Sequence, residues 1–136
     1  MRNIVFLILL SIHLSFAGDL VVVANKNSSL SNLTKKDVVD IFLKKRLFIN
    51  ETKIVAVNLP ASNHIRANFE KNFLKMEPDE LADYWTEKHY YGVTPPIIQQ
   101  STDGLKAFIK HVDGAIGYID RDKVDSDLKI VYQNTK

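Results

Sequence analysis

The residues best suited to chemistry lie between Asn58 and Arg66, where a β-branched run gives way to a turn and then to a helical pattern. A helix start exposes backbone N–H groups and carries a partial positive charge, and both suit an anion. Ser62, Asn63 and His64 could add side-chain donors, and Arg66 a full positive charge. An anion site at this turn is one hypothesis. From spacing alone, the commoner arrangement is a plain helix cap with His64 and Arg66 facing solvent.

Other residue patterns offer little chemistry. His64, His89 and His111 are far apart and lack the H-x-x-x-H spacing of a metal site. The carboxylate pairs Asp79/Glu80 and Asp83/Glu87 fall on expected helix surfaces, where carboxylates are usually solvated. The sequence contains no nucleophile-elbow motif and no phosphate-binding glycine loop. We therefore expect no enzyme activity, no metal site and no cofactor.

The composition suits one globular domain. The chain has 136 residues, of which 46% are hydrophobic and 25% charged. Its 18 Lys and Arg against 16 Asp and Glu give a net charge of +2, which argues against a strongly basic nucleic-acid-binding protein. There is no Cys, so a disulfide framework and thiolate chemistry are excluded.

The N-terminus has the features of a secretory signal peptide. Arg2 supplies a positive charge, Ile4–Leu10 is uninterruptedly apolar, and Ser15 and Ala17 are the small residues that a signal peptidase reads. We expect cleavage after Ala17, leaving residues 18–136 as the domain. The alternative is an uncleaved membrane anchor, but the apolar stretch is shorter than the ~20 residues that a spanning helix needs. An exported protein without Cys suits a bacterial periplasm.

The apolar pattern predicts alternating strands and helices. Strands are expected at 20–24, 53–58, 97–98, 115–119 and 127–132. Helices are expected at 35–44, after 62–63, from 78 and after 101. This order predicts an α/β fold with a largely parallel sheet covered by helices. In such sheets ligands bind at the carboxyl ends of the strands.

Two segments of the expected helices have alternative interpretations. Leu81, Tyr84 and Trp85 are expected to form a buried helix face, although Trp85 with its neighbouring tyrosines could also be a ligand platform. The basic triplet 44–46 is interpreted as a solvated helix end that suits the helix dipole, with a partner or membrane patch as the alternative.

Five segments follow one another along the chain: VVVAN at 21–25, SLSNLTKKDVVDIFLKKR at 29–46, IVAVNLPASNHIRANF at 54–69, LADYW at 81–85 and DGAIGYI at 113–119. In this order they resemble the substrate-binding proteins of phosphate ABC transporters, and in particular the small single-lobe members of that superfamily. The resemblance implies one α/β lobe of the type 2 periplasmic-binding-protein fold, with a mostly parallel sheet flanked by helices. It also implies a periplasmic location and a role near oxyanion uptake.

The resemblance also suggests site residues. In full-length relatives one phosphate-binding turn has the form Ser-Gly-Thr followed by Arg, and the matching stretch is 63–66. Arg66 fits, but Asn63, His64 and Ile65 depart from the pattern, so two hydroxyl donors are lost and a Cβ stands where close backbone approach is wanted. On this resemblance an anion would be lined by Ser28, Ser29, Ser62, Asn63, His64 and Arg66.

Two functions follow from the sequence. In the first, the protein is a periplasmic substrate-binding protein for phosphate or a related oxyanion, associated with an ABC permease. One lobe supplies half a cleft, so it would bind weakly or form a homodimer. In the second, it is a protein-interaction module of the cell envelope without solute affinity. Neither function involves a nucleic acid.

Overall fold

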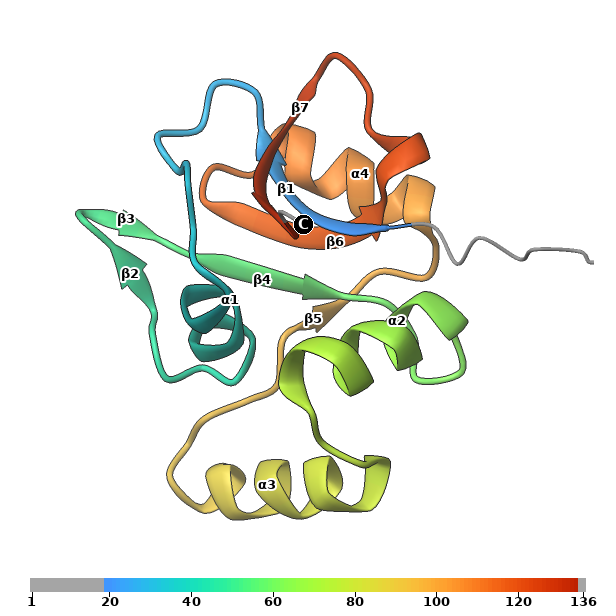
Figure 1. Ribbon diagram of the computed structural model, residues 1–136. Helices are drawn as coiled ribbons and strands as arrows, with labels where there is room; N and C mark the ends of the chain where they lie inside the picture. Colours follow the sequence, from blue (N-terminus) through green and yellow to red (C-terminus); the bar gives the residue numbers. More distant parts are fainter. Residues whose placement is uncertain (1–18, 135–136) are drawn as a thin grey trace, which may run out of the picture.

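The computed structural model describes residues 19–134, and the expected signal peptide at 1–17 lies outside that range. The centre of the structure is a five-stranded sheet with the strand order β5-β4-β6-β1-β7 (Figure 1). These strands are β1 Leu20–Asn25, β4 Val55–Asn58, β5 Ile97–Ile98, β6 Ala115–Asp120 and β7 Leu128–Gln133. A separate hairpin pairs β2 Phe48–Ile49 with β3 Thr52–Lys53.

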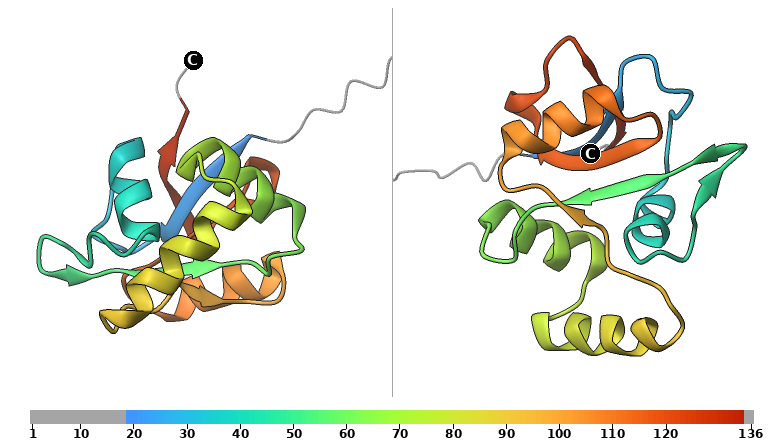
Figure 2. Two further views of the ribbon diagram at one scale, coloured as in Figure 1. Left: turned by 90° about the horizontal axis from the view of Figure 1, so that it is seen from below. Right: turned by 180° about the vertical axis from the view of Figure 1, so that it is seen from behind.

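Helices lie on both faces of the sheet, with α4 on one face and α1 and α2 on the other (Figure 2). The helical segments are α1 Lys35–Phe42, α2 His64–Phe69, the π-helical turn η1 Glu70–Leu74, α3 Pro78–Tyr90, α4 Thr102–His111 and the 3₁₀ turn η2 Arg121–Lys123. The caps expected from the sequence are present. The Asn63 side chain accepts from Ile65 N–H, and the Ser101 hydroxyl accepts from Gly104 N–H.

Two neighbouring residues of β6 explain how both faces are filled, because successive strand side chains point to opposite faces. Tyr118 is fully buried and stacks on Phe69 of α2, with ring centroids 4.1 Å apart. On the other face Gly117 lets α4 approach, since a Cβ there would lie 2.9 Å from Leu105 Cδ2. The core therefore runs through the sheet from α2 to α4.

The expected α/β class is confirmed, but the sheet is mixed rather than mostly parallel. β4 is parallel to β5 and β6, whereas β1 is antiparallel to both β6 and β7. A strand covered on both faces has a continuously apolar sequence, whether it runs parallel or antiparallel to its neighbours. The sequence pattern therefore located the strands without fixing the direction of β1.

The segment from 42 to 54 also differs from expectation. α1 ends at Phe42 rather than near Lys44, because Lys44 adopts the left-handed conformation with φ 59°. The strand expected at 53–58 is divided between β3 and β4, and β2 was not expected at all. Each strand of this hairpin has only two residues, too few to show an alternating pattern.

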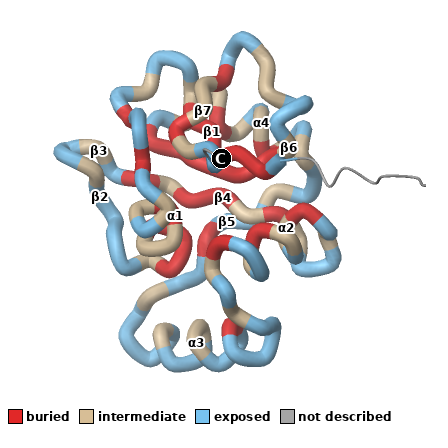
Figure 3. Tube along the Cα trace, viewed as in Figure 1, coloured by how far each residue is buried: buried red, intermediate tan, exposed pale blue. Residues whose placement is uncertain are grey.

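α3 stands apart from the core, and Figure 3 shows it mostly half-buried or exposed. Leu81 is its only buried residue. Tyr84 and Trp85 are half-buried and lie outside the hydrophobic core, so the expected buried face is only partly right. The Tyr84 hydroxyl donates to the Leu43 carbonyl at 2.7 Å and ties α3 to the end of α1. None of the helices within residues 19–134 is both long and apolar enough to cross a membrane.

Candidate anion site

The candidate site lies where three parallel strands end. Because β4, β5 and β6 point the same way, their carboxyl ends lie side by side. We call this end of the sheet, where the three strands finish, its carboxyl edge. The chain leaves β4 at Asn58, turns through residues 59–63 and enters α2. This is the edge at which α/β sheets commonly bind ligands.

A buried tyrosine holds the start of this turn. The Tyr118 hydroxyl accepts from the Leu59 N–H at 3.2 Å and donates to Asn58 Oδ1. Burial raises the pKa of Tyr118 well above its ordinary value, so the hydroxyl keeps its proton and remains a donor. The Leu59 carbonyl in turn accepts from Arg66 Nη1 at 2.9 Å. Side chains therefore satisfy both polar groups of Leu59.

Asn63 shapes the rest of the turn. Its N–H donates to the Pro60 carbonyl at 2.9 Å, and its Oδ1 accepts from the Ile65 N–H at 2.8 Å. Ser62 and His64 on either side are exposed. Within residues 19–134 no acceptor takes the N–H of Ser62 or of His64. The turn therefore presents two backbone donors and two polar side chains to solvent.

The Arg66 side chain is fully engaged in contacts within the fold. Its Nε forms an ion pair with Glu70, one helical turn further along the chain, and the two side chains are only 15% and 14% exposed. Together with the bond to Leu59, this pairing neutralises the guanidinium and fixes its direction. His64 faces solvent, as in the plain-cap alternative, but Arg66 does not.

Acidic groups also lie near the turn. The pKa of Asp120, at the end of β6, is raised by burial and by the neighbouring Asp122 carboxylate, while His64 acts in the opposite direction. The Arg66 charge is offset by Glu70, and the positive charge of Lys123 lies near the carboxylates of Asp120 and Asp122. An anion here would be held mainly by hydrogen bonds.

The structure does not bring Ser28 and Ser29 to this edge. They follow β1, which is antiparallel to β6, so they lie at the opposite edge of the sheet. The Ser29 hydroxyl is 3.2 Å from the Thr52 hydroxyl of the hairpin, and the Ser28 hydroxyl accepts from the Leu30 N–H. Within one copy of the chain the six predicted residues therefore do not form one wall. The cause is the direction of β1.

A groove that sequence reasoning missed begins beside the turn. It lies between α2 with η1 and α3, has a volume of about 500 Å³, and is lined at one end by Ala61 and Arg66. From α3, Leu81 and Trp85 contribute apolar surface, so Trp85 lines a groove instead of filling the core. A volume of this size is typical of small-molecule pockets. The sequence signal was the aromatic residue beside Leu81.

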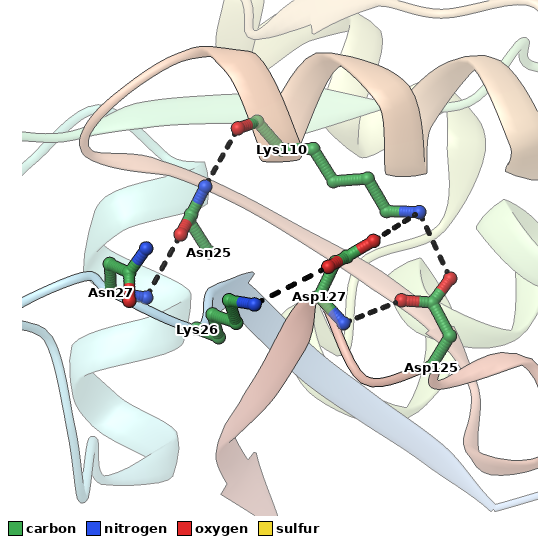
Figure 4. Close-up of polar contacts among 6 residues, drawn as sticks. All are labelled: Asn25, Lys26, Asn27, Lys110, Asp125 and Asp127. Atoms are coloured by element: carbon green, nitrogen blue, oxygen red, sulfur yellow. Dashed lines mark hydrogen bonds and ion pairs between the residues drawn. The ribbon is translucent and has the colours of Figure 1, made fainter.

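The opposite edge carries a network of compensated charges (Figure 4). Lys110 Nζ lies 3.1 Å from Asp125 and 3.5 Å from Asp127, and Lys26 lies 3.6 Å from Asp127. The Asn25 side chain donates to the Lys110 carbonyl at 2.7 Å. Hydrogen bonds from Lys106, the Asp127 N–H and Lys110 lower the pKa of Asp125 well below its ordinary value. Among the described residues, no three His, Cys, Asp or Glu side chains gather as a metal site would require.

The chain is similar in structure to several solved substrate-binding proteins. An ABC-type phosphate transport receptor from Vibrio cholerae matches with a TM-score of 0.70 at 24% identity, over 84% of this chain and 45% of the receptor. A putative phosphate ABC transporter substrate-binding protein with bound phosphate from Clostridium perfringens matches at 0.69 and 21% identity, over 84% and 44%. PstS from Borrelia burgdorferi matches at 0.59 and 16% identity, over 75% and 40%.

No protein-family model matches the sequence, and no curated protein does either. This chain spans less than half of the length of each of these three structures, and the level of identity establishes the fold alone. The chain therefore has the α/β fold found in about half the length of phosphate ABC transporter substrate-binding proteins, an extent that corresponds to a single lobe.

Proposed function

We propose that this protein binds phosphate or a related oxyanion as a substrate-binding-like component of ABC-type uptake, and that it is not an enzyme. The observation that carries the proposal is the turn after β4, which presents the free N–H groups of Ser62 and His64 at the carboxyl edge of three parallel strands. The similar folds of two proteins described as phosphate transport components support it.

In this proposal Ser62 and His64 contact the anion, while Asn63 and Arg66 position the turn. The assignment follows from the hydrogen bonds, because Arg66 is occupied by Glu70 and Leu59 while Ser62 and His64 are exposed. Binding through neutral donors at an exposed edge is weak unless another surface excludes water. A second copy of the chain or a permease would supply that surface.

The proposed location is the periplasm, reached through a signal peptide at residues 1–17. The basis is the sequence: the single charge of Arg2, the apolar run and the small residues before Gly18. N-terminal sequencing of the protein recovered from the periplasm tests this step and is expected to begin at Gly18.

The binding proposal is tested by thermal unfolding of the purified protein with phosphate, sulfate or chloride at matched ionic strength. An oxyanion at 100 times its Kd is expected to stabilise the fold by about 2.7 kcal/mol. Asn63→Ala should abolish the shift because it removes the cap that shapes the turn.

Ser101→Ala is the matched control, since it deletes a cap of the same kind at α4 and should keep the anion response. The two variants are expected to lose similar stability, about 1 kcal/mol each. Equal melting temperatures in all three salts, with no movement of the amide signals of 62–66 on titration, would contradict the proposal.

A second function, a protein-interaction module of the cell envelope, is favoured by one observation. Large apolar side chains are exposed at the end of α3 and on the edge strand β5: Tyr90 is 85% exposed, Tyr91 75%, Ile97 44% and Ile98 47%. Adjacent exposed apolar side chains such as these two pairs are candidates for protein contacts. A flat anion response together with specific crosslinking through either pair would select the second function.

A further inference from the structure

A basic and apolar surface lies on the β2–β3 hairpin and the end of α1, which we name the hairpin patch. It consists of Lys44, Lys45, Leu47, Phe48 and Lys53. Leu47 is 48% exposed and Phe48 53%. The hairpin projects from the body of the molecule, beyond the edge of α1 (Figure 1). None of these residues belongs to the candidate anion site.

The hairpin register places Phe48 and Lys53 of the patch on one face of the ribbon. Phe48 pairs directly with Lys53, so these side chains share the outer face of the two-stranded ribbon. Ile49 and Thr52 form the other pair, and Ile49 packs against the core while Thr52 contacts Ser29. The inner pair therefore attaches the hairpin, and the outer pair faces away from the core.

The positive charges of the patch are not compensated. Among residues 19–134, Lys44, Lys45 and Lys53 take part in no ion pair, and Glu51 at the hairpin tip is the carboxylate nearest to them in the hairpin sequence. The third basic residue of the triplet differs, since Arg46 pairs with Asp37 at 2.6 Å. Burial and the neighbouring charge of Lys53 lower the pKa of Lys44, as expected for two close lysines without a counterion.

Lys44 also occupies an unusual backbone position. It lies just after the end of α1 with φ 59°, where glycine is the usual residue because other side chains crowd the backbone. A lysine here carries a conformational cost and adds a charge beside Lys53. Replacing Lys44 with glycine is therefore a mild experimental variant, because Lys44→Gly removes the charge and suits the left-handed backbone.

We propose that the hairpin patch binds the surface of an anionic membrane, with the lysines at lipid headgroups and Phe48 entering the interface. Charge complementarity identifies an anionic partner, and the exposed Phe48 beside Lys53 identifies one with an accessible apolar layer. The size of the patch favours a membrane over a protein, because a stable protein interface needs about 800 Å² from each partner, usually 20–30 residues.

The test is co-sedimentation of the purified protein with vesicles of phosphatidylcholine alone or mixed with phosphatidylglycerol, at low and high salt. Binding is expected only to the anionic vesicles and is expected to fall with salt. The double variant Lys44→Gly/Lys53→Gln should weaken binding about 25-fold, from about five-fold for each lysine. Phe48→Ser should weaken it with the charge unchanged.

The matched control is Lys75→Gly/Lys71→Gln, on η1 and its connection to α3. Lys75 has the same left-handed backbone, with φ 52°, and both lysines are exposed. The control carries the same change in net charge and should bind as the unmodified protein does. Equal loss in both double variants, or no binding of the unmodified protein to anionic vesicles, would overturn the proposal. Patch-dependent crosslinking to an envelope protein without vesicle binding would overturn it in favour of a protein partner.

Discussion

At the scale of single residues, Tyr118 links the core to the candidate site. Its ring is fully buried in a cluster with Phe69 and Phe42, and its hydroxyl reaches the first residue after β4. A residue that fills the core therefore also fixes where the turn begins. The geometry of the exposed donors at Ser62 and His64 depends on a side chain that no ligand would touch.

Tyr118→Phe is predicted to destabilise the fold by about 1–3 kcal/mol, because the Leu59 N–H loses its acceptor in a buried place. The ring remains, so the aromatic packing is kept. Urea unfolding measures the change. Tyr132→Phe is the matched control, because its hydroxyl donates to the exposed Asn134 at 2.6 Å, and its effect should stay within about 0.5 kcal/mol. Equal effects of the two variants would show that the hydroxyl of Tyr118 does not hold the turn.

At the scale of elements, α3 differs from the other helices in how it is attached. α1 buries three side chains in the core and α2 and α4 bury two each, whereas α3 buries Leu81 alone, and Leu81 lies outside the core cluster. Its further anchor is the bond from Tyr84 to the Leu43 carbonyl. The α2 wall of the groove between α3 and α2 is therefore anchored in the core, whereas the α3 wall is attached by few contacts.

We predict that α3 opens locally at a lower free energy than the central strands. Native-state hydrogen exchange should show the amides of 82–90 exchanging well before those of β1 and β6. Tyr84→Phe should speed the exchange in α3 further, by about five-fold for a bond contributing about 1 kcal/mol. It should leave β1 and β6 unchanged. Uniform protection across α3 and the sheet would contradict this picture.

The sequence predicted those strands and helices that are marked by a continuous apolar run or by a capping residue next to them in the chain. The apolar runs at 20–24 and 115–119 correspond to β1 and β6, and Asn63 caps α2 as its residue type suggests. The direction of β1 was not predictable, because its pairing partners lie about 90 or more residues away in the sequence. The β2–β3 hairpin was missed because it rests on two paired residues per strand.

The candidate site shows the same limit. Ser62, Asn63 and His64 adjoin in the sequence and lie together in the fold. Arg66 was expected to face an anion, but a glutamate four residues later takes its charge. That i,i+4 pairing is visible in the sequence and was the signal that Arg66 has a structural partner. The separation of Ser28 from the turn followed only from the direction of β1.

At the scale of the whole molecule, the two edges of the sheet have different electrostatic character. The edge with the turn presents exposed neutral donors, whereas the opposite edge has ion pairs among α4, the residue that follows β1 and the segment that precedes β7. Asp125 is the centre of this second group, since Lys106 approaches it at 2.9 Å and Lys110 at 3.1 Å. Because these contacts join segments distant in the sequence, they contribute to the stability of the entire fold.

The carboxylate of Asp125 should therefore make global stability depend on pH in a defined direction. Its pKa is lowered in the folded state, and the unfolded value is about 3.9. Its contribution is then fully present above that unfolded pKa and is lost as pH falls through the folded pKa. Asp125→Asn should lower Tm by the same amount at pH 7 and pH 5. This gap in Tm between the unmodified protein and the variant should become smaller below about pH 4, where the carboxyl group of the unfolded chain is already protonated.

Thermal unfolding of both proteins between pH 7 and pH 2 measures this gap. Asp83→Asn, which changes an exposed carboxylate on α3 outside the network, is the control and should leave Tm nearly unchanged throughout. High salt should narrow the gap at neutral pH, because the lysine partners are partly exposed. If the gap stayed constant down to pH 2, the network would act through packing rather than charge.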